Sequence, residues 1–297
     1  MTSRRTVLIT GGTGSLGFQT ARAILDAGDG WDVVVTGRDR AAVEDAAARL
    51  GSSTTGLPLD LSSLAEVRRF AQDLPPIRAV VCNAGLQTIS GTTLTKDGIE
   101  QTFGVNHLAH FLLVKEILPR MATAGRVVFV ASDTHDPAKR TGMPAPVYTN
   151  AHSLAYPVDS DTDTPGVVGR RRYTTSKLCN VLAAYEFARR VPADMATFNA
   201  FDPGLMPGTG LARDYRGVQA LAWRYVMPAL TILPGFNIHT ARQSGRALAR
   251  LVFDPTLADA TGKYFSGRHE VRSSDESYDT DKAADLWKTS STLAGVS

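Results

Sequence analysis

Short apolar runs alternate with longer helical patterns over the first two thirds of the chain. Six runs rich in β-branched residues are bounded by turn residues, and a seventh follows a turn near the end, which indicates buried strands with helices between them. We expect these strands at Thr6–Thr10, Asp32–Thr36, Gly56–Leu59, Ala79–Cys82, Arg126–Ala131, Thr197–Phe201 and Lys263–Ser266. The alternation predicts an α/β fold with a doubly wound parallel sheet, whose ligands bind at the carboxyl ends of the strands.

The 297 residues contain no Pro/Gly/Ser-rich linker or change of composition, so we expect a single domain over 1–297. The net charge of +3 comes from basic residues spread along the sequence, which argues against a nucleic-acid partner. The N-terminus lacks the pattern of a secretory signal, so we expect a cytoplasmic protein. The two cysteines, Cys82 and Cys179, lie in apolar segments and are expected to be buried thiols.

The longest apolar stretch is Val218–Phe236. Arg224, Pro228 and Pro234 interrupt it, so it predicts a pair of short helices rather than a membrane span.

A glycine-rich turn follows the first predicted strand, and a helix is expected to open at about Phe18. Glycines let the chain turn tightly and bring bare N–H groups to a phosphate at the positive end of a helix. Because strand precedes and helix follows, we interpret the turn as a pyrophosphate site rather than as a plain connection. The residues expected to bind are Gly11, Thr13, Gly14, Ser15, Leu16 and Gly17.

The second predicted strand ends in Gly37-Arg38-Asp39. A nucleotide site chooses here between a carboxylate that holds a ribose hydroxyl and a guanidinium that pairs with a 2′-phosphate. Gly37 leaves the usual acidic position empty and Arg38 follows it, so NADP(H) is the expected cofactor. The alternatives are that Arg38 is a solvated surface residue or that Asp39 turns toward the ribose.

Tyr173 and Lys177 are four residues apart in a helical pattern, so they share one helix face. An ammonium ~4 Å from a phenol is worth about 4 kcal/mol at an effective dielectric constant near 20, enough to lower the phenol pKa toward neutrality before desolvation opposes it. The pair alone is also common on helix surfaces. Its setting among the other motifs favours a chemical role.

Together these motifs resemble the short-chain dehydrogenase/reductase family across nearly the whole length, which implies a Rossmann fold. The resemblance rests on the glycine turn, Asp60-Leu61, Asn83-Ala84-Gly85, Asn106, Ser132, Tyr173 with Lys177, and Pro203-Gly204. It implies that Tyr173 exchanges a proton with the substrate oxygen and that Ser132 orients this oxygen. Lys177 would lower the tyrosine pKa and hold the nicotinamide ribose, and Asn106 would fix a water in a proton relay.

For the remaining motifs the resemblance implies cofactor contacts. Asp60 and Leu61 would border the adenine, and Asn83, Ala84 and Gly85 would support the ribose region. Pro203, Gly204 and Thr209 would flank the nicotinamide and pyrophosphate.

Simpler structural interpretations stay open for several of these residues. Ser132 can be a strand-end hydroxyl, Asn106 a helix-packing amide, Asp60 a helix cap and Pro203-Gly204 a turn. His107 and His110 suggest a metal, but two histidines without a third ligand favour helix packing.

Two features depart from the usual family pattern. Ser15 stands in place of the middle glycine of the turn, and a long, largely polar segment with five prolines, about 133–172, separates Ser132 from Tyr173. We expect the second to be an insertion beside the site. With segments 103–113 and 202–214, it is most similar to the branch of protochlorophyllide reductases and retinol-dehydrogenase-like enzymes.

The expected activity is hydride transfer between NADP(H) and a carbonyl or secondary alcohol of a hydrophobic small molecule. A lid over about 205–240 would supply an apolar lining, with Trp223, Tyr225, Met227, Leu230 and Phe236. Two alternatives remain: a light-dependent protochlorophyllide reductase-like enzyme, and a non-catalytic NADP(H) sensor. Family members often pair through the helices that correspond to about 98–120 and 173–191, so a homodimer or homotetramer is a hypothesis.

Overall fold

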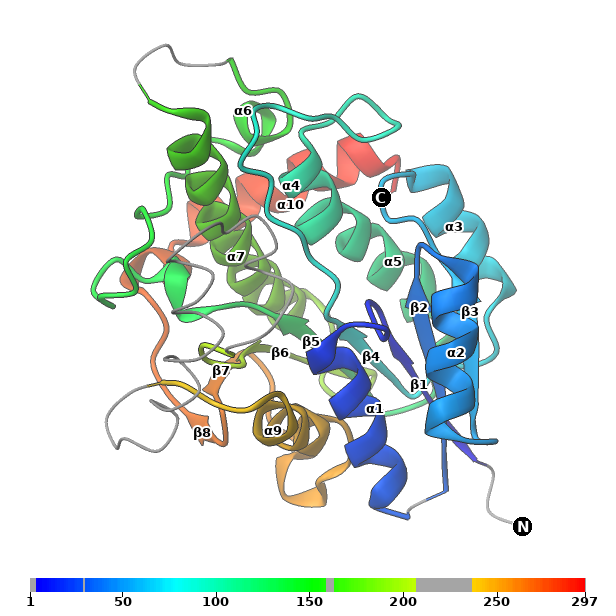
Figure 1. The fold of residues 1–297 in the computed structure, drawn as a ribbon. Helices are drawn as coiled ribbons and strands as arrows, with labels where there is room; N and C mark the ends of the chain where they lie inside the picture. Colours follow the sequence, from blue (N-terminus) through cyan, green and yellow to red (C-terminus); the bar gives the residue numbers. More distant parts are fainter. Residues whose placement is uncertain (1–3, 29, 159–162, 207–236, 297) are drawn as a thin grey trace.

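An eight-stranded sheet forms the centre of the chain in the computed structural model, which describes residues 4–28, 30–158, 163–206 and 237–296 (Figure 1). The strand order is β3-β2-β1-β4-β5-β6-β7-β8, and every neighbouring pair is parallel except β7 and β8. The order reverses direction between β1 and β4, which is where a doubly wound sheet binds its ligand. The strands are β1 Arg5–Ile9, β2 Trp31–Gly37, β3 Thr54–Pro58, β4 Ala79–Cys82, β5 Gly125–Val130, β6 Ala196–Asp202, β7 Lys263–Ser266 and β8 His269–Glu270.

Helices cover both faces of this sheet (Figure 1). The longer ones are α1 Ser15–Asp26, α2 Arg40–Leu50, α3 Leu64–Asp73, α5 Ala109–Ile117, α7 Pro165–Arg190, α9 Ala241–Phe253 and α10 Thr280–Ala294. Two short helices, α4 Gln101–Phe103 and α6 Ala151–Ala155, lie between them, and a π-helical turn over Gly104–Leu108 joins α4 to α5. Short 3-10 turns occur at Leu118–Arg120, Asp133–His135, Pro255–Leu257 and Asp275–Tyr278.

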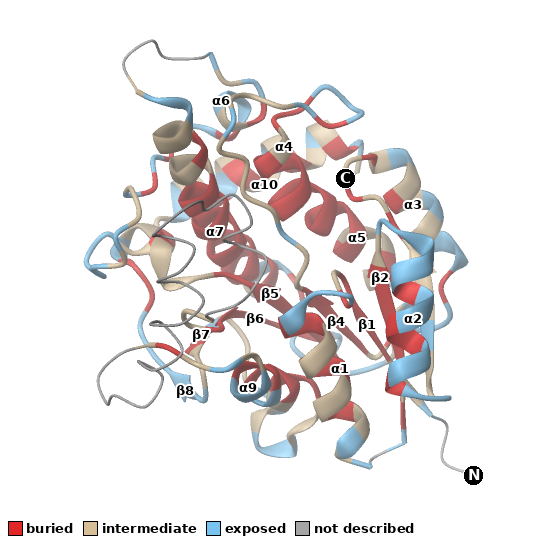
Figure 2. Cartoon of the chain, in the orientation of Figure 1, coloured by how far each residue is buried: buried red, intermediate tan, exposed pale blue. Residues whose placement is uncertain are grey.

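Residues along each central strand alternate between two apolar cores. In β1, Val7 and Ile9 pack with α1 and α9 on one face, whereas Leu8 packs with α3, α5 and α7 on the other. Both faces are covered, so the central strands β4, β5 and β6 are buried throughout, as their red colour in Figure 2 shows. This double burial explains why the strands are almost uninterrupted apolar runs in the sequence.

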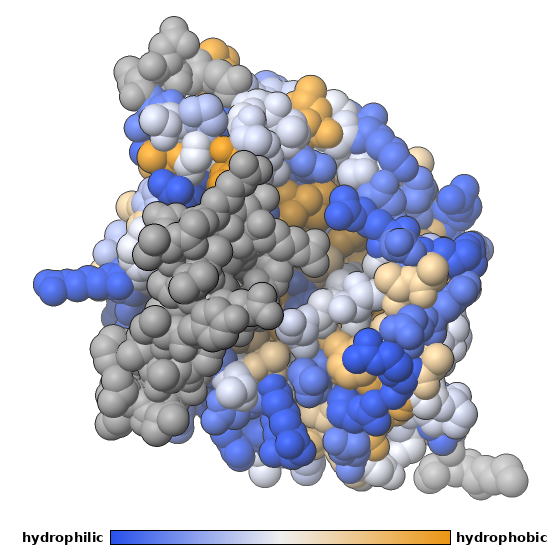
Figure 3. All heavy atoms as spheres, viewed as in Figure 1, coloured by the Kyte–Doolittle hydropathy of each residue, from blue (hydrophilic) through white to orange (hydrophobic). Residues whose placement is uncertain are grey.

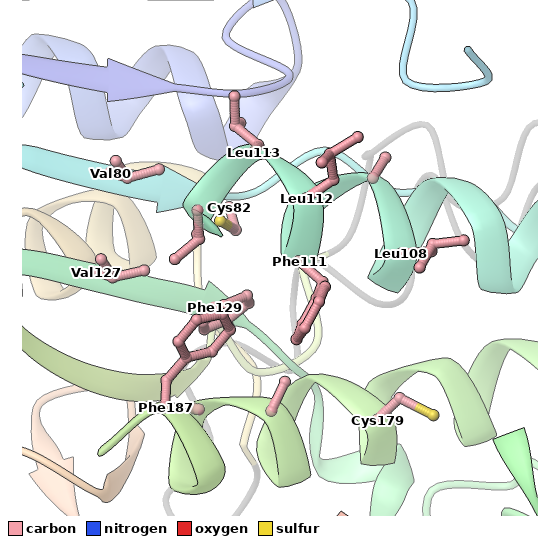
Figure 4. Packing of buried hydrophobic residues seen from close by; sticks show 14 of the residues in the cluster. Val80, Cys82, Leu108, Phe111, Leu112, Leu113, Val127, Phe129, Cys179 and Phe187 are labelled. Carbon is pink, nitrogen blue, oxygen red and sulfur yellow. The ribbon is translucent and has the colours of Figure 1, made fainter. Parts of the chain in front are cut away.

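Aromatic rings fill the core beneath α5 and α7. Phe129 of β5 stacks on Phe187 of α7 with ring centroids 5.8 Å apart, and Phe111 of α5 lies 5.4 Å from Phe187 (Figure 4). Cys82 and Cys179 are both free and buried in this core, and burial raises the pKa of each thiol. The expectation of two buried thiols is therefore confirmed.

All seven predicted strands are present, with ends that differ by at most two residues, and β8 is an additional strand.

Two helix starts were predicted too late. Helix α1 begins at Ser15 rather than near Phe18, because Gly14 in an extended conformation already serves as its N-cap. Helix α7 begins at Pro165, where a proline suits the first turn because its missing N–H has no helical partner to lose.

The expected insertion is shorter than predicted and ends before α7. Val147 N–H donates to Thr175 Oγ1 on α7 at 2.9 Å, and Tyr148 Oη donates to Asp285 Oδ2 on α10 at 2.7 Å. Residues 147–151 therefore pack between α7 and α10. The apolar stretch 218–236 and its proposed pocket residues lie outside the described residues. Of the helices that are described, none has both the length and the apolarity to cross a bilayer.

Candidate active site

The glycine turn between β1 and α1 has the geometry of a phosphate cradle. Gly11 adopts φ +67°, and a Cβ on Gly17 would lie 2.5 Å from the carbonyl oxygen of Gly11, so the turn closes only with glycine at these positions. The N-cap Gly14 has no side chain to cap the helix, which leaves the first N–H groups of α1 directed at solvent. A 12-residue helix with bare N–H groups favours an anion here, so the turn fits the pyrophosphate of a dinucleotide.

The end of β2 lies against this turn. A Cβ on Gly37 would come within 3.3 Å of Thr13 Oγ1, so the absence of a side chain at position 37 lets the two segments approach. Arg38 is exposed beside them. The Asp39 carboxylate accepts the N–H of Ala42 at 3.1 Å and so caps α2. This hydrogen bond uses the carboxylate within the helix cap rather than for a ribose.

Asp60 follows β3, and its carboxylate already has protein partners. Its carboxylate accepts the Ser62 N–H at 2.9 Å and pairs with Lys96 at 3.0 Å. Burial alone would raise its pKa, but these two partners hold the pKa below the usual value. The cap of α3 is Ser63 rather than Asp60. A contact of Asp60 or its neighbour Leu61 with adenine stays a prediction.

The loop after β4 is fastened to the glycine turn by Asn83. Its Nδ2 donates to the carbonyl oxygens of Thr10 at 2.8 Å and Gly11 at 3.2 Å. Thr10 Oγ1 accepts the N–H groups of Asn83 and Ala84 and lies 2.8 Å from His110 Nε2. Asn83 therefore sets the shape of the cradle, and the ribose contact expected for this loop stays a prediction.

Both histidines of the 103–113 segment have protein partners. His110 Nδ1 lies 3.1 Å from the carbonyl of Asn106, and His107 Nε2 lies 2.9 Å from Ser290 Oγ. Burial lowers the pKa of His107 to about 3 and that of His110 to about 4, so both rings are neutral at physiological pH. They pack within the helices, in agreement with the expectation that helix packing outweighs a metal role.

Asn106 lies in the π-helical turn and connects three segments. Its Oδ1 accepts the N–H of Leu86 at 2.8 Å, and its Nδ2 donates to the Leu86 carbonyl at 2.9 Å and to Ser176 Oγ at 3.0 Å. A Cβ on Gly85 would lie 3.4 Å from Asn106 Oδ1 and 3.5 Å from Lys177 Nζ. Asn106 and Lys177 thus both lie next to Gly85, in the loop after β4. The water relay assigned to Asn106 stays a prediction.

Ser132 lies just past the end of β5 and is half-buried. Its carbonyl is 2.6 Å from His135 Nδ1, and the other nitrogen of that ring accepts the N–H of Ser274 at 3.1 Å. Because an N–H must donate, Nε2 of His135 carries no proton and Nδ1 is the donor to Ser132. Ser132 is therefore held by a neutral histidine, as well as by the turn Asp133–His135 that it caps.

Tyr173 and Lys177 lie on one face of α7, toward this same end of the sheet. They are only 6% and 4% exposed, which excludes the interpretation as a surface pair. Lys177 Nζ donates to the carbonyl of Val130 at 3.0 Å and lies 5.5 Å from the centroid of the Tyr173 ring. Asn180, one turn further along α7, donates to the same carbonyl at 3.0 Å.

Burial determines the protonation of this pair. It lowers the pKa of Lys177 to about 8, an effect that Asp202 partly opposes, so the ammonium is still mostly charged at neutral pH. Burial, followed by the negative charges of Asp202 and Asp133, raises the pKa of Tyr173 above its usual value. The expected lowering of the phenol pKa is therefore not found in this structure, because burial and two carboxylates act on the phenol in the opposite direction.

Pro203 and Gly204 form the turn after β6. Gly204 has φ +69°, and its N–H donates to Asp202 Oδ1 at 2.9 Å, while Ser244 Oγ donates to the Pro203 carbonyl at 2.6 Å. A Cβ on Gly204 would lie 2.7 Å from Asn237 Oδ1. Thr209 and nearly all of the proposed lid lie outside the described residues.

Three residues at this edge were missed by sequence reasoning: Asp133, Asp202 and Asn237. Asn237 Nδ2 donates to Asp133 Oδ2 at 3.0 Å and to Asp202 Oδ2 at 2.8 Å, so one amide bridges two carboxylates. The two acidic residues did carry a signal, since each is a charge placed at the end of a buried strand. Asn237 carried none.

The chain has relatives of known family. Residues 5–149 match the family described as short chain dehydrogenase. Protochlorophyllide reductase B, chloroplastic, of Oryza sativa subsp. japonica is 32% identical over 317 residues, which cover 98% of this chain and 77% of that protein. Protochlorophyllide reductase of Avena sativa is 32% identical over 321 residues, which cover 98% of this chain and 99% of that protein.

Among solved structures, an uncharacterised protein from Mycobacterium paratuberculosis superposes with a TM-score of 0.73 at 27% identity. The match covers 99% of this chain and 94% of that chain. Fold, motif positions and relatives therefore agree, and the chain belongs to the short-chain dehydrogenase/reductase family of oxidoreductases.

Proposed function

We propose that this protein is an NADP(H)-dependent reductase of a carbonyl group on a hydrophobic small molecule. The observation that supports this most directly is the buried pair Tyr173 and Lys177 beside Ser132, at the end of the sheet that carries the phosphate cradle. The nicotinamide cofactor supplies the hydride. The protein positions the substrate oxygen, with Ser132 as hydrogen-bond donor and Tyr173 as the source of the proton.

The raised pKa of Tyr173 suits its phenol to act as the acid in a reduction. A phenol that keeps its proton is an acid, and it can give that proton to the oxygen that becomes an alcohol when hydride reaches the carbonyl carbon. In the reverse direction the phenol would have to ionise first, which burial and the nearby Asp202 and Asp133 disfavour. Lys177, fixed by the Val130 carbonyl, stabilises the negative charge left on the phenolate.

The preference for NADP(H) rests on the end of β2. Gly37 has no carboxylate, Asp39 is engaged as a helix cap, and the exposed Arg38 is the cation nearest the expected 2′-phosphate along the chain. Charge-assisted hydrogen bonds are worth about 1.5–3 kcal/mol.

We therefore expect Arg38→Gln to weaken NADPH binding by roughly 10- to 150-fold while leaving NADH binding nearly unchanged. Calorimetric titration of both cofactors measures this. The matched control is Arg40→Gln, because Arg40 is also exposed and pairs with Glu44 at 3.6 Å. Equal weakening of both cofactors by Arg38→Gln would contradict the role, and equal affinity of the unaltered protein for both would contradict the preference.

A hydrophobic substrate is suggested by the surface near the site. Figure 3 shows apolar atoms in the hollow that lies above α1 in this view, with mostly hydrophilic atoms around its rim. The direct test is NADPH oxidation with a panel of lipophilic aldehydes and ketones. Turnover with at least one of them, lost in Tyr173→Phe, is the expected result.

Two alternatives have tests of their own. Tight NADPH binding without turnover on any substrate would favour a cofactor sensor. The names of the plant relatives favour a second candidate, reduction of protochlorophyllide. Illumination of the protein with NADPH and protochlorophyllide tests it, because reduction would convert the pigment absorbance in the light with NADPH and not in the dark or without NADPH.

A further inference from the structure

A hydrogen bond within the site competes with the role expected of Ser132. Ser132 Oγ accepts the N–H of Thr134 at 3.3 Å and donates its only proton to Asp133 Oδ1 at 3.4 Å. To orient a substrate carbonyl, the same hydroxyl has to donate to the substrate instead. The ionised carboxylate of Asp133 is therefore a competitor for the Ser132 proton.

The bridge formed by Asn237 decides which oxygen of Asp133 can carry a proton. Asn237 Nδ2 donates to Oδ2 of Asp133 and to Oδ2 of Asp202, so Oδ2 of Asp133 already accepts an N–H. Oδ1, which faces Ser132, is left for protonation. A proton on Oδ1 would be donated to Ser132 Oγ, which has a second lone pair to accept it. The Ser132 proton is then released for the substrate oxygen.

Burial and the charges around Asp133 favour this protonation. Burial raises its pKa, and the fully buried carboxylate of Asp202 on β6 raises it further, against the hydrogen bonds from Asn237 and Ser132. Asp202 in turn is held by the N–H of Gly204 and by Ser266 Oγ of β7 at 2.9 Å each. Two carboxylates that share one amide resist ionising together.

Among the residues that the structure describes, the other ionisable groups near Asp133 are neutral or engaged. His135 is neutral, and on β7 the ring of Tyr264 packs against it at 5.0 Å. On α7, Tyr173 is a neutral phenol, while the Lys177 ammonium is held by the Val130 carbonyl. Asp136 is turned to the N–H of Ala138.

We propose that Asp133 is a positioning residue whose protonation releases the Ser132 hydroxyl to the substrate oxygen, so that mild acid favours turnover. This inference rests on the proposed carbonyl reduction. It predicts that kcat/KM rises as the pH falls through the ionisation of Asp133. No atom is transferred to the substrate by Asp133, which only exchanges a proton with solvent.

The decisive variant is Asp133→Asn. Asn237 donates toward position 133, so the new amide turns its oxygen to Asn237 and its N–H to Ser132, as protonated Asp133 would. We expect kcat/KM for benzaldehyde with NADPH to become flat between about pH 5 and pH 8 and to exceed the unaltered value at pH 7 by about two- to tenfold. A loss of activity at every pH would indicate a merely structural role and overturn the proposal.

Two further variants sharpen the test. Asn237→Ala removes a donor that stabilises the ionised form, so the acid-favoured change should move to higher pH. Asp136→Asn makes the same substitution three residues away, at a side chain that does not contact Ser132, and should keep the unaltered profile.

A readout without turnover separates this inference from the proposed function. The protein is labelled with ¹³C at the aspartate carboxyl carbons and titrated by NMR. The signal that disappears in the Asp133→Asn variant belongs to Asp133, and its shift with pH reports the ionisation of this carboxyl group. A titration midpoint above about 4 agrees with the proposal, and a midpoint at or below that value overturns it. If no carbonyl is reduced at any pH, the proposed function fails, while the titration still decides the protonation of Asp133.

Discussion

Replacement of Tyr173 by Phe is expected to lower kcat/KM for carbonyl reduction by about 10²- to 10⁴-fold while leaving the affinity for NADPH nearly unchanged. The variant removes one hydroxyl from a ring that is 6% exposed, so the helix and the cofactor cradle keep their packing. What is lost is the proton donor, and general acid catalysis typically contributes an effect of this size. Initial rates of NADPH oxidation, with a separate cofactor titration, measure the two quantities.

Tyr185→Phe is the matched control for this change. Tyr185 is also buried on α7, and its hydroxyl lies 2.7 Å from Ser273 Oγ, so the same substitution removes one buried hydrogen bond away from the site. We expect it to cost about 1 kcal/mol of unfolding free energy and to leave the rate unchanged. If Tyr173→Phe kept more than a tenth of the activity, the phenol would not be the proton donor.

The strands were predictable because burial on both faces leaves a continuous apolar run. Ala79–Cys82 shows this most clearly, since its predicted bounds match the strand. The positions of Tyr173 and Lys177 on one face also followed from their spacing. Their pKa values did not, because burial and the carboxylates of Asp202 and Asp133 come from other elements.

Features that depend on distant segments carried no local signal. Asn237 bridges Asp133 and Asp202 from 104 and 35 residues away. The π-helical turn at Gly104–Leu108 was also not predicted, since its residues fit an ordinary helical pattern. This turn contains Asn106, which it places against the loop after β4. The insertion stays a prediction, and only the fold shows that residues 147–151 pack along α7 and α10.

Helix α10 packs on the outer face of α5 and α7, and its Trp287 contacts both helices. The indole meets Phe111 and Phe187 edge-on, with ring centroids 5.1 and 4.7 Å away, and the charged ends of Lys115 and Arg190 lie over it. His107 and Ser290 join the same two layers. This is the face through which family members would pair, so its coverage by α10 predicts that the chain does not dimerise there. A monomer in light scattering would agree with this prediction, whereas a dimer that pairs through α5 and α7 would contradict it.

Trp287→Ala is expected to lower the unfolding free energy by about 3 kcal/mol, the low end of the range for core aromatic rings, because it removes a large but only partly buried ring from the aromatic cluster between α5, α7 and α10. The midpoint of thermal unfolding should fall by roughly 10 °C, measured by calorimetry. Trp287→Phe retains a ring and should lose less than half as much. Because the apolar face of α5 and α7 is then less well covered, the alanine variant should also self-associate on warming. A midpoint within about 2 °C of the unaltered protein would show that α10 contributes little, and the argument against pairing through this face would fail with it.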